Sequence, residues 1–307
     1  MPTVAVVRQL SAADRRRIDR FLAGVTGAQG RPGLECERLD DHLLLDFRHG
    51  PRAGFLAALA TDHGDMIGYA QASSSAAGHV VDSIVSPASP RHMKAHLLGH
   101  LLDELPVDSG VTWWAHDDDR PLAEALGLEP GRRLLQMRAD LPGPEPSPDF
   151  ITRPYVVGAD DEALLRVNNT AFASHGEQGG WDLELLRQRQ REQWFDPHGL
   201  LVHEATGSMD GFCWTKVHPA TPGHDDIVGE IYVVAVDPDH RGTGLGRQLV
   251  LAGLAHLTAV GAPTCMLYVD AGNAPAIGLY SSLGFRTVHA EQSFTRSHTG
   301  AHDDLDR

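Results

Sequence analysis

Residues 230–247 read EIYVVAVDPDHRGTGLGR, and this stretch decides the fold class. The apolar letters ahead of the proline predict a buried strand, and the letters that follow the last glycine begin an amphipathic helix. In between, Gly242, Gly244 and Gly246 leave room for backbone N–H groups to approach an anion. Because the positive end of the helix dipole faces this loop, the strand, loop and helix together favour a pyrophosphate ligand.

The spacing within this loop separates it from two common nucleotide-binding loops. From Arg241 the pattern is Arg-x-x-Gly-x-Gly, whereas a dinucleotide fold requires Gly-x-Gly-x-x-Gly and a nucleotide-triphosphate loop ends in Gly-Lys-Ser/Thr. Coenzyme A is the remaining common candidate. The structural alternative is a glycine-rich turn that only joins a strand to a helix.

The chain is acidic overall. Its 307 residues include 26 Lys and Arg against 41 Asp and Glu, for a formal net charge of −15. Nucleic-acid binding depends on many basic side chains that neutralise phosphates, so we expect no nucleic-acid partner. Cys36, Cys213 and Cys265 suggest no disulfide framework, and neither a secretion signal nor a long apolar run is evident. We therefore expect a cytoplasmic protein with no membrane partner.

A proline-rich segment divides the chain. Residues 141–149 read LPGPEPSPD, and four prolines in this stretch favour an extended spacer over a helix or a central strand. We predict an N-terminal domain at residues 1–142, a linker at 143–151, a C-terminal domain at 152–296 and a flexible tail at 297–307.

The two halves share a weak internal similarity. VVDSIVSP at 80–87 matches IYVVAVDP at 231–238, and ALGL at 125–128 matches SLGF at 282–285. The matching elements recur at an offset of roughly 150 residues, which is typical of a duplication. We predict an α/β fold with a mixed (α+β) sheet, repeated as two tandem domains.

Two motifs then point to one family. VDPDHRGTGLG at 236–246 resembles motif A of the GNAT acyltransferases, and NAPAIGLYSSLGF at 273–285 resembles their next motif, Asn-x-x-Ala-x-x-x-Tyr-x-x-x-Gly-Phe. The two occur in the expected order and at an ordinary separation. The resemblance implies GNAT domains and acetyl-CoA as the acetyl donor, without a metal.

Further segments resemble a narrower group, the mycothiol synthase family of tandem GNAT enzymes. They lie at residues 165–181, 194–197, 212–219, 229–237 and 266–270, and the N-terminal half agrees in its organisation, including LLQMR at 134–138. That family acetylates the cysteinyl amine of desacetylmycothiol, so the resemblance implies a small-molecule substrate; we expect a monomer. An N-acetyltransferase for another amine, or a non-catalytic acetyl-CoA sensor, stays open as an alternative.

Acyl transfer from a thioester needs a base for the amine and an acid for the leaving thiolate. Glu230, on the strand ahead of the loop, is the candidate base, acting directly or through water; a solvated Glu at a strand start is the structural alternative. Tyr280 is the candidate acid, and the alternative is a tyrosine that only packs in the core.

The resemblance also implies the residues that bind acetyl-CoA. The backbone of 234–236 would hold the acetyl and pantetheine portions, while Gly278 stands where relatives often have a basic side chain, so that affinity depends more on Arg241 and Arg247. The full candidate set is Val234, Ala235, Val236, Arg241, Gly242, Thr243, Gly244, Leu245, Gly246, Arg247, Asn273, Ala274, Pro275, Ala276, Ile277 and Gly278.

The candidate acceptor-binding residues implied by the resemblance are Glu35, Glu177, Lys216, Glu230 and Tyr268. Glu177 lies in a glycine-rich stretch, which favours a binding loop. For Lys216 the alternative is a solvated surface charge. Glu37 lies close enough to Glu35 to exchange with it in the alignment.

The corresponding loop of the N-terminal domain departs from the motif. Residues 88–96 read ASPRHMKAH, with Met93 and Ala95 where the second loop has Gly244 and Gly246. A Met side chain would crowd the backbone approach that glycine permits. We therefore expect this domain to be non-catalytic and to bind acetyl-CoA weakly or not at all, with any contact through residues 83–85.

Scattered histidines and cysteines do not predict a metal or a nucleophile. His175, His203, His218 and His240 lack helical ligand spacing with a supporting carboxylate, so no metal is expected. Cys265 has no adjacent His and Asp to activate it, which favours buried packing.

Overall fold

The computed structural model describes residues 2–28, 54–75, 78–90, 92–115, 117–173, 178–205, 207–220 and 226–296. It forms two compact units. The first contains Met1–Arg133 with Glu291–Arg307, and the second contains Leu134–Ala290.

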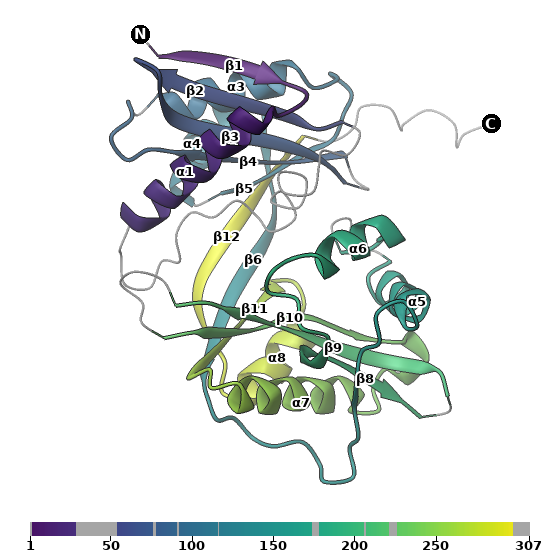
Figure 1. Cartoon of the computed structure of the whole chain (residues 1–307). Helices are drawn as coiled ribbons and strands as arrows, with labels where there is room; N and C mark the ends of the chain where they lie inside the picture. Colours follow the sequence, from purple (N-terminus) through teal and green to yellow (C-terminus); the bar gives the residue numbers. More distant parts are fainter. Residues whose placement is uncertain are drawn as a thin grey trace, which may run out of the picture. The chain divides into compact units, whose positions relative to one another are not determined.

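The first unit is a mixed sheet between helices (Figure 1). Helix α1 packs on one face through Ile18 and Phe21, and α3 packs on the other through Leu97 and Leu101. Among the strand pairs of this unit that the structure describes, β4 and β5 are parallel and the others are antiparallel. Its strands, in spatial order, are β1 (Thr3–Val7), β2 (Leu56–Asp62), β3 (Asp65–Ser75), β4 (Gly78–Val85), β5 (Val111–Ala115) and the end of β12 (Arg286–Arg296). Its helices are α1 (Ala12–Ala28), α3 (Met93–Asp103) and α4 (Arg120–Ala125), with a 3-10 turn at Asp117–Asp119.

The second unit repeats this plan. Helices α7 and α8 cover one face of its sheet, while α5 and α6 lie on the other (Figure 1). Its strands, in spatial order, are β6 (Glu129–Asp140), β11 (Thr264–Asp270), β10 (Val228–Val236), β9 (Met209–His218), β8 (Leu200–Glu204) and β7 (Arg153–Pro154). Its helices are α5 (Asp161–Ala171), α6 (Leu183–Gln190), α7 (Leu245–Ala259) and α8 (Ala274–Ser282), with 3-10 turns at Pro197–Gly199 and Pro238–His240.

The repeated order of elements confirms the predicted mixed α/β fold. In each unit, three antiparallel strands lead through a helix to a parallel strand and then to a second helix. The apolar run 233–236 forms the end of β10, with Val233 and Ala235 buried, and α7 follows the glycine loop as the sequence predicted.

The units do not follow the boundaries expected from the sequence, because two strands cross between them. The second half of β6 pairs with β11, from Leu134 opposite Asp270 to Asp140 opposite Thr264. The end of β12 pairs with β5, from Gln292 opposite Ala115. The proline-rich segment therefore follows a strand that already belongs to the second unit. Strand pairing over such sequence separations leaves no local signal.

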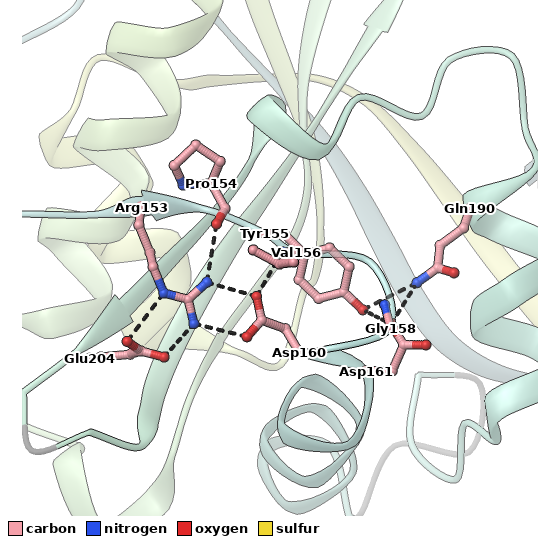
Figure 2. Close-up of polar contacts among 9 residues, drawn as sticks. All are labelled: Arg153, Pro154, Tyr155, Val156, Gly158, Asp160, Asp161, Gln190 and Glu204. Atoms are coloured by element: carbon pink, nitrogen blue, oxygen red, sulfur yellow. Dashed lines mark hydrogen bonds and ion pairs between the residues drawn. The ribbon is translucent and has the colours of Figure 1, made fainter.

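A polar network holds the start of α5 against β7 and β8 (Figure 2). The Arg153 guanidinium donates to both carboxylate oxygens of Asp160, at 2.7 and 2.8 Å, and also pairs with Glu204. The hydrogen bond from Arg153 lowers the pKa of Asp160, despite burial that opposes its ionisation. Next to it, Tyr155 Oη and Gln190 Nε2 donate to Asp161 Oδ1, at 2.5 and 3.1 Å, which ties α5 to α6.

We expect Asp160→Asn to lower the free energy of unfolding by about 1–2 kcal/mol at neutral pH, since a charge-assisted pair with half-exposed Arg153 is lost. A carboxyl whose pKa is depressed in the folded state stabilises above its unfolded pKa and loses that contribution as pH falls through the folded value. The difference between wild type and variant should therefore narrow below about pH 4. Urea unfolding across pH, with exposed Asp149→Asn as the control, measures this; a pH-independent difference would contradict it.

Candidate functional site

The sheet of the second unit opens between β10 and β11. Among the described residues, the two parallel strands pair only at Gly229 with Cys265 and at Glu230 with Met266, although both strands continue beyond. On its other edge, β10 stays paired with β9 as far as Val236, with a bulge between Ile231 and Val233. Backbone groups of β10 beyond Glu230 thus leave the β11 ladder. An extended chain of amides could pair with them there, and residues 234–236 lie in this stretch.

The glycine loop presents the N-terminus of α7 at the end of the same strand. Gly242 and Gly244 have φ of 78° and 87°, values that favour glycine. The first-turn N–H groups of any helix have no carbonyl of their own helix to meet, and Gly244 supplies no side-chain cap; Leu245 N has a long contact of 3.4 Å with Thr243 Oγ1. These groups and the helix dipole form a site that fits a phosphate.

Gly246 is a different case, because its backbone is ordinary for a helix. A Cβ built there would lie 3.6 Å from Val236 Cγ2, an unstrained contact. Glycine inside a helix costs about 1 kcal/mol relative to alanine. Neither packing nor backbone conformation within the chain therefore requires a glycine at position 246. The missing side chain leaves open space beside the first turn of α7.

Contacts around the loop fix its position. Arg241 Nη2 donates to the carbonyl of Ala171 at 3.0 Å, and Arg247 Nη1 donates to Ser282 Oγ of α8 at 2.7 Å. His240 Nε2 lies 3.3 Å from the buried carboxylate of Asp210. Both arginines stay exposed, so their charge is available to an anion at the loop.

Helix α8 brings Tyr280 into the core beside α7. Asn273 caps this helix by accepting from Ala276 N at 3.2 Å, which gives it a structural role as well as its predicted one. The Tyr280 ring meets Phe285 with centroids 5.9 Å apart. Burial raises the pKa of Tyr280 above its ordinary value, so the hydroxyl keeps its proton at neutral pH.

The opposite face of the sheet gathers three predicted site residues. Strand register places Lys216 directly across from Glu230 on β9, and Met266 beside Glu230 on β11. Tyr268 is two residues further along β11 and therefore on the same face, where Gln136 Nε2 donates to its hydroxyl at 2.9 Å. Glu230 is 6% exposed, which contradicts the alternative of a solvated carboxylate at a strand start.

Lys216 is not a surface charge either. It is 5% exposed, and its ammonium lies 4.8 Å from the ring centroid of Trp194 and 5.4 Å from that of Tyr232. Such contacts stabilise a cation in a partly desolvated place. The same aromatic group includes Trp214, whose ring meets Tyr232 edge-on at 5.6 Å.

The sequence did not single out one close partner of Glu230. His218 Nε2 lies 2.6 Å from Glu230 Oε2, and both side chains are largely buried. The sequence suggests His218 only as one of the scattered histidines that do not predict a metal. The usable signal was strand alternation, since Lys216 and His218 are two residues apart and must share a face.

Several predicted residues fall elsewhere. Glu35, Glu37, Glu177 and Arg91 lie outside the described residues. In the first unit, Met93 begins α3 and is fully buried in the core. Within the described part of the chain, no group of three or more His, Cys, Asp or Glu side chains is arranged to hold a metal ion.

Two further properties concern the described residues only. None of their helices is both long and apolar enough to cross a membrane. Cys213 and Cys265 are free and fully buried, and burial raises the pKa of the Cys213 thiol to about 12 and that of Cys265 further. Both thiols therefore stay protonated and pack as small apolar groups.

Comparison with known proteins gives the site a family. Residues 166–285 match the Acetyltransferase (GNAT) family. A mycothiol acetyltransferase of Thermobispora bispora is 43% identical over 257 residues, covering 80% of this chain and 85% of the relative. One of Thermomonospora curvata is 45% identical over 279 residues, covering 88% and 90%.

Solved structures agree on the fold. A tandem GNAT protein from the clavulanic acid biosynthesis pathway matches with a TM-score of 0.71 at 16% identity, covering 97% of this chain and all of that one. A GCN5-related N-acetyltransferase from Sphaerobacter thermophilus matches with a TM-score of 0.65 at 22% identity, covering 96% and 95%. The chain belongs to the mycothiol acetyltransferase family, within the GNAT superfamily.

Proposed function

We propose that this chain is an acetyl-CoA-dependent N-acetyltransferase that acetylates the cysteinyl amine of desacetylmycothiol, giving mycothiol and CoA in the last step of mycothiol biosynthesis. Family membership supports the reaction. The observation that carries it is the buried carboxylate of Glu230 at the point where β10 and β11 separate. Desacetylmycothiol is the small-molecule partner, and the protein acts as a cytoplasmic monomer.

Acetyl-CoA, when bound, supplies the acetyl group as a thioester. The backbone of residues 234–236 would hold its amide-containing arm along the opened edge of β10, in place of the missing β11 ladder. First-turn N–H groups of α7, with Arg241 and Arg247, would hold its pyrophosphate. The start of α8, residues 273–278, would border the remainder.

The chain's own residues divide the proton transfers between two faces of the sheet. Glu230 accepts a proton from the acceptor ammonium on the α5 and α6 face, directly or through water. Tyr280 lies in the core on the α7 and α8 face, and its hydroxyl donates a proton to the leaving thiolate. In this proposal the reacting groups meet where β10 and β11 cease to pair.

Lys216 and Tyr268, beside Glu230, bind the acceptor's polar groups in this proposal, together with Glu35 and Glu177. The first unit is non-catalytic. Its Met93 occupies the core where the second loop has open glycines, which supports weak or absent acetyl-CoA binding there. Equilibrium binding should find one tight coenzyme site per chain, and two tight sites would contradict this assignment.

The acceptor is tested by mixing the purified protein with acetyl-CoA and a panel of amines while following CoA release. We expect turnover with desacetylmycothiol and little with aminoglycosides or lysine peptides. Activity on another amine without desacetylmycothiol turnover would overturn the acceptor assignment. Coenzyme binding without turnover of any amine would favour an acetyl-CoA sensor.

We expect Gly246→Glu to weaken acetyl-CoA binding by about tenfold or more, because a carboxylate at the first turn of α7 repels the phosphates. The fold should tolerate the change, since an acidic residue there favours the helix dipole. Gly99→Glu is the matched control: a Cβ at this glycine of α3 meets nothing within 4 Å, and a Cβ at Gly246 meets Val236 Cγ2 at an ordinary 3.6 Å. Calorimetric binding and thermal unfolding check both variants; unchanged affinity in Gly246→Glu would contradict the assigned phosphate site.

A further inference from the structure

His218, at the end of β9, is in direct contact with the candidate base Glu230. Along this strand Trp214, Lys216 and His218 alternate onto the face that carries Glu230. His218 pairs in register with Val228, so it reaches Glu230 diagonally, with Nε2 at 2.6 Å from Oε2. The side chains of His218 and Glu230 are 13% and 7% exposed, so little water competes for this contact.

The other polar groups near Glu230 are not placed as His218 is. Lys216 lies opposite on β9, with its ammonium over the rings of Trp194 and Tyr232. On β11 the titratable groups near Glu230 are Tyr268, which lies on the same face and accepts from Gln136, and Cys265, whose thiol stays protonated and belongs to the α7 face. Within the described part of the chain, the Glu230 carboxylate forms its side-chain hydrogen bond with His218.

A carboxylate that takes a proton must present a defined oxygen to it. Unrestrained, the terminal torsion of a Glu side chain is broad and roughly two-fold. A donor fixed on one oxygen selects one orientation and leaves the other oxygen toward the amine. A neutral imidazole that carries its proton on Nε2 is such a donor.

We propose that His218 is the positioning residue for the base: its Nε2–H binds Glu230 Oε2 and directs Oε1 to the acceptor amine. This inference rests on the proposed function. His218 touches neither the amine nor the thioester; it acts through Glu230.

The test compares His218→Leu, which removes the donor, with His218→Gln, whose amide N–H can still reach the carboxylate. In His218→Leu we expect kcat with desacetylmycothiol to fall by about tenfold or more, with the KM for acetyl-CoA within about twofold. His218→Gln should recover most of the rate, and exposed His198→Leu should behave as wild type.

A double variant separates positioning from an independent role. If His218 acts through Glu230, adding His218→Leu to Glu230→Gln lowers kcat no further, whereas independent effects would multiply. Should His218→Leu fail to fold, His218→Asn, whose shorter amide cannot reach Oε2, takes its place. Wild-type turnover in the donor-less variant, or multiplied losses in the double variant, would overturn the inference. Absence of wild-type turnover with every amine would instead sink the proposed function on which it rests.

Discussion

Glu230→Gln is expected to lower kcat with desacetylmycothiol by about 10²–10⁴-fold, the usual contribution of a general base. The amide keeps the shape of the side chain and can still accept from His218, but it cannot take the ammonium proton. Since Glu230 lies at the last recorded pair of β10 with β11, the coenzyme sites at residues 234–236 and in the glycine loop stay intact. The dissociation constant for acetyl-CoA should therefore change by less than about twofold.

Release of CoA, followed with a thiol reagent, measures the rate, and calorimetry measures coenzyme binding. As pH rises, the amine loses its proton unaided, so the variant should regain rate relative to wild type. Glu184→Gln, on an exposed carboxylate at the start of α6, is the matched control. A wild-type kcat in Glu230→Gln at neutral pH would rule out this residue as the base.

Tyr280→Phe carries the second large effect, with an expected loss of about 10²-fold or more in kcat. The ring keeps its contact with Phe285, so thermal unfolding should hardly change. Because burial raises the pKa of Tyr280 above its ordinary value, the hydroxyl remains a proton donor into the alkaline range, and wild type should not lose rate there through Tyr280 ionisation.

The leaving group distinguishes this role from simple packing. An acetyl thioester whose thiol is more acidic needs less help to depart, so it should restore rate to Tyr280→Phe. It should not restore rate to Glu230→Gln, where the amine is the limitation. If both variants respond alike to the better leaving group, Tyr280 is not the acid.

The sequence predicts the fold well wherever local pattern is sufficient. The strand before Pro238 and the helix after the glycine loop depend on neighbours within a few residues, and each appears in the structure. The crossing of β6 and β12 between the units depends on pairs far apart in the chain, such as Gln292 with Ala115. No periodicity in the sequence reveals such pairs, so the domain boundaries expected from the sequence differ from those of the two units.

The same distinction applies to the candidate site. Motif spacing marks Glu230 and the glycine loop. For Lys216 the sequence leaves two interpretations open, a binding residue or a solvated surface charge, and the rings of Trp194 and Tyr232 beside its ammonium exclude the second. The contact of His218 with Glu230 is between residues of β9 and β10 that lie diagonally across the ladder and do not pair with each other. It requires the register of β9 against β10, which a single sequence does not contain.

The central claim is tested most directly by the chemical identity of the product. After incubation with acetyl-CoA and desacetylmycothiol, tandem mass spectrometry locates the new acetyl group, and a thiol reagent reports whether the cysteine sulfur is free. We predict one acetyl group on the cysteinyl nitrogen, a free thiol and one CoA released per product. A thioester on sulfur, an acetyl group on a sugar hydroxyl, or unchanged desacetylmycothiol would contradict the account.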